Sequence, residues 1–214
     1  MSIPHTFKPL GVSSGGALPP GYERVDSVFK DASTYWQTDL PIGSGYRVDT
    51  CFMITKRDMY SEFSLFANNQ PPSNNRIYYI FAGGQNFRMQ PSRFVAIDPT
   101  QTFSLNLNEK IRVICEQRDY GVTLIWGDLY FNADGLTPIS KTGDFQLGAS
   151  ITSYGTLNAT SECRIYSFRV YKAGTNILLA NYVPYRRVTD EGMEYGLFDT
   201  VKKNVLPAIG EPKP

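Results

Sequence analysis

Strand-length segments separated by turn residues constrain the fold of this chain more than any other feature. In residues 46–54 the apolar and polar side chains alternate, so that Tyr46, Val48, Thr50 and Phe52 share one face. A period of two is typical of a β-strand that is buried on one side. Strand-like segments followed within a few residues by Gly, Pro, Asn or Asp also occur at 77–81, 94–97, 102–107, 111–116, 122–126, 164–171 and 177–183. The pattern predicts a β-sandwich or barrel.

Helical signals are weak in comparison. No stretch of ten or more residues keeps an apolar stripe at helical spacing between capping residues. Aromatic residues make up 14% of the chain, and 18 Gly and 14 Pro supply turns. The composition therefore agrees with an all-β chain.

The ends of the 214-residue chain differ from its middle. Residues 1–21 are rich in Gly, Ser and Pro and are predicted to form a flexible arm, with residues 22–206 as one β domain and 207–214 as a loose, Pro-rich tail. Four spaced apolar residues are candidates for docking the arm on a partner: Ile3, Phe7, Leu10 and Val12. A disordered leader is the alternative interpretation.

Charge and cysteine content exclude several classes of protein. Lys and Arg total 21 against 20 Asp and Glu, for a net charge of +1, which argues against a strongly basic nucleic-acid binder. No apolar run approaches the length of a membrane span, and no export signal follows Met1. Cys51, Cys115 and Cys163 are scattered and are predicted to be reduced residues in strands. These features predict synthesis in a reducing cytoplasm.

No motif for catalysis or metal binding is evident. The single histidine, His5, lies in the arm, so a triad based on histidine is not expected. The acids Asp190, Glu191 and Glu194 are predicted to be solvated loop residues. Residues 132–135 are more simply a turn than a calcium loop. We therefore expect no enzyme and no cofactor; calcium is conceivable, but no specific motif supports it.

Exposed aromatic rings are the other candidates for a site, because a ring face can stack on a sugar. Tyr35, Trp36, Tyr120 and Tyr154 are the candidates for glycan binding. Tyr35 and Trp36 are adjacent, so in a strand one points inward and the other outward. For each ring the alternative is packing in the core.

The last quarter of the chain carries a specific series of motifs. Residues 176–184 have the sequence NILLANYVP, residues 185–187 are YRR, and residues 196–199 are GLFD. Together with the strand-like residues 165–171, this series resembles the end of laminin-G-like (concanavalin A-like) jelly-roll domains in bacteriophage structural proteins and gut-bacterial surface proteins. The opening segment LPPGY at 18–22 also resembles the start of such domains.

The resemblance covers most of residues 22–206. It implies an all-β, two-sheet antiparallel jelly-roll sandwich with an extended N-terminal arm. It further implies that Pro184 ends a strand, that residues 203–204 form a turn, and that Arg186, Arg187 and Asp190 pair near a sheet end. The side chains expected inside the sandwich are Phe168, Val170, Leu178, Ala180 and Tyr182.

The resemblance implies a non-enzymatic phage virion protein, either a capsid decoration or a fibre or tail component. Such a protein is assembled in the host cytoplasm and then resides in the virion. Its expected partners are other virion proteins through the arm, surface glycans, and further copies of itself, with no nucleic acid or membrane. Two alternatives stay open: a glycan-binding module of a bacterial surface or secreted protein, and a jelly-roll glycosidase or lyase.

Overall fold

The structure is a computed structural model of the 214-residue chain. It describes residues 16–41, 45–56, 62–68, 76–80, 86–90, 95–96, 107–134, 144–148, 150–151, 157–158 and 162–214. Within these ranges the regular structure is β-strand throughout, and every strand pair is antiparallel. The predicted all-β, two-sheet class is confirmed.

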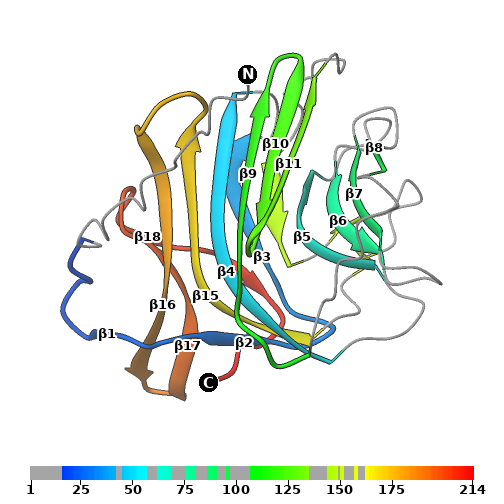
Figure 1. The fold of residues 1–214 in the computed structure, drawn as a ribbon. Coiled ribbons are helices and arrows are strands. Elements are labelled where there is room, and N and C mark those ends of the chain that lie inside the picture. Colours follow the sequence, from blue (N-terminus) through cyan, green and yellow to red (C-terminus); the bar gives the residue numbers. More distant parts are fainter. Residues whose placement is uncertain are drawn as a thin grey trace.

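The larger sheet has ten strands, and its main path runs β11-β10-β9-β4-β15-β16-β17-β18 (Figure 1). β1 pairs with β16, and β2 pairs with β15. The strands are β1 (Tyr22–Arg24), β2 (Val28–Lys30), β4 (Tyr46–Lys56), β9 (Ile111–Arg118), β10 (Gly121–Trp126), β11 (Leu129–Asp134), β15 (Glu162–Lys172), β16 (Leu178–Thr189), β17 (Gly192–Asp199) and β18 (Asn204–Val205). This sheet carries the predicted closing motifs.

The second sheet has seven strands in the order β19-β3-β12-β5-β6-β7-β8. They are β3 (Tyr35–Pro41), β5 (Glu62–Asn68), β6 (Arg76–Ile80), β7 (Asn86–Gln90), β8 (Val95–Ala96), β12 (Asp144–Leu147) and β19 (Ala208–Ile209). A short pair, β13 (Ser150–Ile151) and β14 (Leu157–Asn158), completes the described strands.

The hydrophobic core lies between the two sheets. Trp36 and Leu40 of β3 and Leu147 of β12 belong to the same buried cluster as Phe52 of β4 and Phe168 of β15. Burial of apolar surface in one contiguous cluster is the main stabilising contribution to such a sandwich. The two layers therefore form a single packed unit.

The predicted alternation in β4 is confirmed. Val48, Thr50 and Phe52 are buried on the core side, and Tyr46 packs against the same cluster. The hairpin predicted around residues 118–121 is also present, with β9 and β10 joined there. Because the side-chain period is two, every second residue of β4, β9 and β15 must point away from the core.

The closing strands follow the resemblance in part. Phe168, Val170, Ala180 and Tyr182 are buried as expected, whereas Leu178 is half-buried beyond an irregularity in the β15–β16 register. The turn at 201–203 precedes Asn204, and Lys203 has a positive φ of 63°.

Pro184 does not end its strand, contrary to prediction. β16 continues to Thr189, and the Pro184 carbonyl accepts a hydrogen bond from the Val25 amide at 3.2 Å. The nitrogen and carbonyl of one strand residue point to the same side. The missing Pro184 N–H therefore faces the side where the partner of β16 changes from β15 to β1, and the ladder with β17 stays intact.

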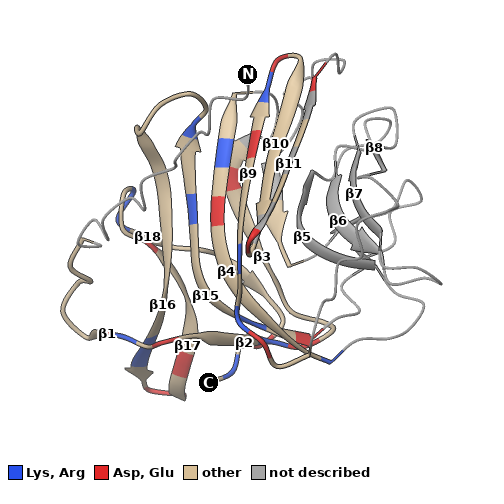
Figure 2. Cartoon of the chain, in the orientation of Figure 1, with Lys and Arg blue, Asp and Glu red and all other residues tan. Residues whose placement is uncertain are grey.

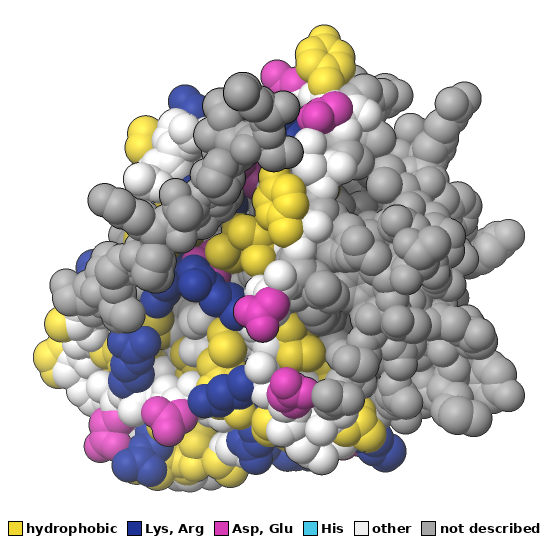
Figure 3. Space-filling view, viewed as in Figure 1, with side chains coloured by type: hydrophobic (Ala, Val, Ile, Leu, Met, Phe, Trp, Pro, Cys, Tyr) yellow, Lys and Arg dark blue, Asp and Glu magenta, His cyan; other side chains and the backbone are white. Residues whose placement is uncertain are grey.

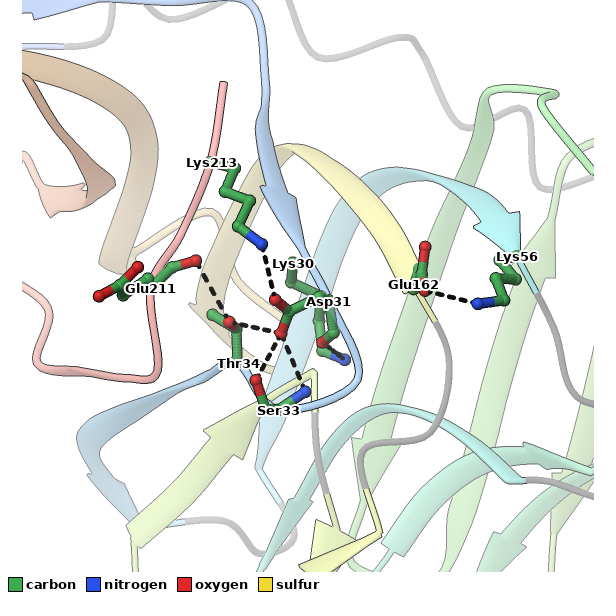
Figure 4. Close-up of polar contacts among 8 residues, drawn as sticks. All are labelled: Lys30, Asp31, Ser33, Thr34, Lys56, Glu162, Glu211 and Lys213. Carbon is green, nitrogen blue, oxygen red and sulfur yellow. Dashed lines mark hydrogen bonds and ion pairs between the residues drawn. The ribbon is translucent and has the colours of Figure 1, made fainter.

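The C-terminal tail is bound to the domain and is not loose as predicted. β19 pairs with β3, and Lys213 exchanges two backbone hydrogen bonds with Phe29, at 2.8 and 3.1 Å. Asp31 accepts hydrogen bonds from the Ser33 amide at 2.9 Å and from the Lys213 ammonium at 3.1 Å (Figure 4). These contacts fasten the last residues to the turn between β2 and β3.

The N-terminal segment that the structure describes also lies against the domain. Leu18 and Tyr22 pack on the buried residues Val183, Tyr185 and Phe198 of β16 and β17. The four candidate docking residues at positions 3, 7, 10 and 12 lie outside the described residues.

The three cysteines are free, as predicted, and lie in β4, β9 and β15. Cys115 and Cys163 are buried, and burial raises the pKa of the Cys163 thiol to about 11. In the described ranges, no helix is long and apolar enough to cross a membrane.

Candidate functional site

The side of the ten-stranded sheet that points away from the core carries an unusual concentration of charged side chains. Figure 2 shows positively and negatively charged residues side by side on β15, β4 and β9. In Figure 3, which looks onto this side, basic, acidic and hydrophobic side chains adjoin one another. We call the outward residues of β4, β9, β10, β11 and β15, with Lys110 before β9, the central patch.

Register aligns these residues in rows across the sheet. Arg169 lies directly opposite Asp49, Asp49 opposite Ile114, Ile114 opposite Ile125, and Ile125 opposite Tyr130. The neighbouring row consists of Tyr171, Arg47, Glu116, Thr123 and Asn132. Directly opposite side chains on one face have Cβ atoms about 5 Å apart, so each row is a continuous surface.

Asp49 and Arg112 form the central ion pair of the patch. The Arg112 guanidinium donates from Nε to Asp49 Oδ1 at 2.9 Å and from Nη2 to Oδ2 at 2.7 Å. Asp49 is only 6% exposed, and the paired carboxylate raises the pKa of Arg112. A two-pronged pair of this kind fixes the orientation of both groups.

Arg47 is held by an aromatic ring and an amide. Its guanidinium carbon lies 4.4 Å from the centre of the Tyr171 ring, and Nη2 donates to Asn176 Oδ1 at 3.4 Å. Arg47 is only 7% exposed. The ring attracts the cation without cancelling its charge.

Two further cations of the patch also lie over rings. The Lys110 ammonium is 3.9 Å from the centre of the Tyr166 ring, and the Arg164 guanidinium is 5.7 Å from that of Phe29. Arg164 also donates to Ser27 Oγ at 3.4 Å. Their alkyl stems cover apolar surface while the charge stays near water.

A polar network and a tyrosine complete the β11 edge of the patch. Arg118 donates to Asn132 Oδ1 at 2.7 Å and to Asp134 Oδ1 at 3.1 Å, and Thr123 donates to Asn132 Oδ1 at 2.9 Å. Tyr130 is 52% exposed in the first row. This edge therefore combines an open ring with amide, hydroxyl and carboxylate groups whose orientations are fixed.

A second polar cluster lies at the far end of β16 and β17, and we call it the hairpin end. Its members are Tyr22, Glu23, Tyr185, Arg186, Arg187 and Glu194. Arg187 donates from Nε to Glu194 Oε2 at 2.7 Å, and the Tyr185 hydroxyl donates to Glu194 Oε1. Burial, followed by the hydrogen bond to Glu194, raises the pKa of Tyr185.

Each arginine of the hairpin end has its own carboxylate. Arg186 pairs with Glu23 at 2.7 Å, while Arg187 also donates to the Tyr22 hydroxyl at 2.5 Å. Two open clefts of about 540 and 360 Å³ flank this end and share Met193 as a lining residue. The predicted pairing of Arg186 and Arg187 with Asp190 is wrong. Arg186 pairs with Glu23, and Arg187 pairs with Glu194.

The three predicted glycan-binding rings that the structure describes are not brought together. Trp36 is fully buried in the core and offers no face to a ligand, so that prediction is wrong. Its neighbour Tyr35 is half-buried opposite Ile209, and Tyr120 is 68% exposed at the β9–β10 turn. Tyr154 lies outside the described residues.

The predicted solvated acids differ from one another. Asp190 and Glu191 are exposed, whereas Glu194 lies within β17 and is held by Tyr185 and Arg187. Among the described residues, no three His, Cys, Asp or Glu side chains gather as ligands for a metal.

Sequence reasoning missed the central patch. Asp49 was visible only as the polar member of an alternating strand, and Arg112 lies 63 residues further along the chain. The available signal was the presence of charged residues among the outward positions of three strands, and it needed the strand register to become a site.

The chain was compared with protein families, with curated proteins and with solved structures. No protein-family model and no curated protein match the chain. An alginate lyase, AlgAT5 of Polysaccharide Lyase family 7, is similar at 14% identity and a TM-score of 0.41, over 65% of this chain. The chain covers 62% of that lyase.

A second solved structure, the galectin LEC-6 of Caenorhabditis elegans, is similar at 11% identity and a TM-score of 0.39. The match covers 66% of this chain and 97% of the galectin. One neighbour is an enzyme and the other a lectin, and neither is a phage or laminin-G-like protein. Likeness at this level does not decide between catalysis and binding.

Proposed function

We propose that the chain is a non-enzymatic carbohydrate-binding module and that the central patch is its binding surface. The observation that carries this proposal is the pair of rows in which fixed arginine, asparagine and carboxylate groups lead to the exposed Tyr130 ring. A sugar presents hydroxyl groups that donate and accept hydrogen bonds, together with a C–H face that stacks on a ring. The patch offers both kinds of contact on one surface.

Rigidity favours this role. Neighbouring strands anchor the patch, and its side chains are already held by contacts such as Asp49 with Arg112. Ordering fewer side chains on binding leaves more of the interaction energy for affinity. Strand-mounted groups are also positioned more accurately than groups on loops.

The test is binding of polysaccharides in affinity gels and by titration calorimetry. We expect retention by at least one polysaccharide and a loss of about tenfold or more when Tyr130→Ala and Arg47→Gln are combined, which would be a change of about 1.4 kcal/mol or more. Val188→Ala is the matched control, because Val188 is 78% exposed and lies outside the patch. Retention that both variants share equally would contradict the proposal.

The same proposal includes the absence of catalysis. Both oxygens of Asp49 already accept hydrogen bonds from Arg112, so this carboxylate is not free to act as a base. Incubation with any bound polysaccharide should release no new reducing ends and no unsaturated products. Release that Asp49→Asn abolishes would revive the glycosidase or lyase alternative.

Display on a bacteriophage particle is the finer part of the proposal. It is supported by the closing motifs of β15 to β18 and by residues 16–21, whose Leu18 packs on β16 and β17. Deletion of residues 2–15 should prevent incorporation into particles and leave the fold intact, since Leu18 stays in place. Incorporation of the deleted protein at the normal level would contradict an attachment role for the arm.

A further inference from the structure

The central patch has more positive than negative charge. Its outward cations are Arg47, Lys110, Arg112, Arg118, Arg164 and Arg169, and its outward carboxylates are Asp49, Glu116, Asp134 and Glu162, the last of which pairs with Lys56. The whole chain carries a formal charge of only +1. Positive charge is therefore concentrated on the surface proposed to bind sugar.

The existing contacts do not neutralise this surplus. Arg112 donates hydrogen bonds to both oxygens of Asp49, so the charge of this carboxylate is already balanced by Arg112. Arg47, Lys110 and Arg164 lie over rings, which attract a cation but carry no net charge. Glu116 lies opposite Arg47 in the register.

Arg169 and Arg47 are diagonal neighbours on one face. Arg169 is opposite Asp49, and Arg47 is opposite Tyr171, two residues further along β15. Within the described part of the chain, neither arginine has an ion pair. Arg47 is buried and Arg169 is half-buried. Each lies opposite a carboxylate in the register, Asp49 or Glu116, but makes no ion pair with it. A guanidinium removed from water without an ion pair is unfavourable, and an anion bound by both arginines would relieve that cost.

We propose that the bound carbohydrate carries acidic groups, as the carboxylate of a uronic acid or as a sulfate ester, and that Arg169 and Arg47 bind this group. The inference rests on the proposed function of the central patch. A guanidinium offers two parallel N–H donors, and these match the oxygens of a carboxylate or sulfate. Tyr130, in the same row as Arg169, remains available to a neighbouring sugar ring.

Nucleic acid is the other polymer with regular negative charge. The patch is less suited to it, because the cations are interrupted by Asp49 and Glu116 and the only described ring that is more than half exposed on the patch is Tyr130. Phosphate binding relies on an uninterrupted cationic surface. We therefore assign the anion to a sugar.

The test compares matched charged and neutral polymers. Polygalacturonate is paired with fully methyl-esterified pectin to probe carboxylates, and dextran sulfate is paired with dextran to probe sulfates. We expect one charged polymer to bind at least tenfold more tightly than its neutral counterpart at 50 mM NaCl, and to weaken several-fold at 300 mM NaCl.

Variants locate the effect. Arg169→Gln should lose at least tenfold in affinity for the charged polymer, and Arg169→Lys, which keeps the charge without the fork, should lose less. Arg186→Gln is the matched control, because Arg186 is an exposed arginine of the same sheet that pairs with Glu23. Unfolding midpoints of all three variants check that the fold is kept, and Arg169→Lys provides the test if Arg169→Gln does not fold.

The outcomes separate this inference from the proposed function. Equal affinity for charged and neutral polymers would overturn the acidic group and leave carbohydrate binding in place. No affinity for any polysaccharide would overturn both. Equally tight binding of single-stranded poly(dT), with the same loss in Arg169→Gln, would overturn the assignment of the anion to a sugar.

Discussion

The central patch lies on the same side of the ten-stranded sheet as Tyr185, Arg187 and Glu194 of the hairpin end, whereas Arg186 and Glu23 lie on the other side. Both regions are built from the same residue types. At the hairpin end, Arg186 and Arg187 each have a carboxylate partner, and Tyr22 covers Arg187. In the central patch, Asp49 pairs with Arg112, while Arg47 and Arg169 have no ion pair among the described residues. The matched arginines fasten strands together, and the unmatched ones are those to which we assign the anion.

The largest expected effect breaks the matched cluster. Glu194→Ala removes the acceptor of the buried Tyr185 hydroxyl and the partner of Arg187. An unsatisfied buried hydroxyl and an unpaired cation together should lower the free energy of unfolding by about 2–3 kcal/mol. Urea denaturation measures it, with the exposed Glu191→Ala as control. A loss below about 0.5 kcal/mol would mean that the hairpin end is not a structural cluster.

The next prediction concerns Asp49→Asn, which should lower the stability of the fold and raise the affinity for the acidic polymer. Asp49→Asn weakens the pair with Arg112 and should cost about 1–2 kcal/mol of folding free energy, since Arg112 is half exposed. The same change removes a negative charge from the central patch. We expect affinity for the acidic polymer to rise about two- to fivefold, measured by calorimetry. A fall in affinity would show that the Asp49 carboxylate itself binds the ligand.

A third ion-pair region is independent of both and serves as a reference. Hydrogen bonds from Ser33, together with one from Lys213, lower the pKa of Asp31 below its ordinary 3.8. A carboxylate with a lowered pKa in the folded state stabilises the fold above its unfolded pKa, and this contribution is lost as the pH falls further. Asp31→Asn should therefore lower stability by about 1 kcal/mol at pH 7 and much less near pH 2.

Thermal unfolding across pH 2–7 measures this effect, and Asp26→Asn is the control. The Asp31 carboxylate contacts Ser33, Thr34 and Lys213 and no residue of the central patch, so polymer affinity at pH 7 should not change. A constant difference in stability across the pH range would show that the Asp31 charge is not responsible.

The smallest effect on stability is expected at the edge of the central patch. Tyr130→Ala removes a ring that is half exposed, so unfolding should shift by less than about 0.5 kcal/mol. Affinity for the polymer should fall about three- to tenfold through the loss of stacking. Tyr120→Ala, at the β9–β10 turn, tests whether the binding surface extends beyond the sheet. An equal loss of affinity in this variant would show that the binding surface includes the turn.

The sequence predicted the strands well where one face is buried. The hairpin of β9 and β10 and the long strands β15 and β16 followed from alternation, which burial enforces directly. Trp36 was assigned wrongly because alternation tells two adjacent rings apart but does not say which one faces the core. Whether the strand ends at Pro184 depended on a change of the neighbouring strand from β15 to β1, and no local sequence pattern shows this change.

The site was less predictable because its members are distant in sequence. Arg169 faces Asp49 only through the β4–β15 register, and Glu194 was taken for a loop acid because it follows two exposed acids. The tail was predicted loose from its Pro content, although its backbone partners are Phe29 and β3. Long-range pairing, and not residue type, decides each of these cases.

The binding of the tail has a consequence for synthesis of the protein. Phe29 leaves the ribosome long before its backbone partner Lys213. β4 likewise waits for β15, and β3 for β19, so neither sheet can close until these distant segments have been made. This non-local pairing predicts slow, millisecond-to-second folding kinetics. During that interval the nascent strands have exposed edges, and chaperones that shield such edges should raise the yield of folded protein.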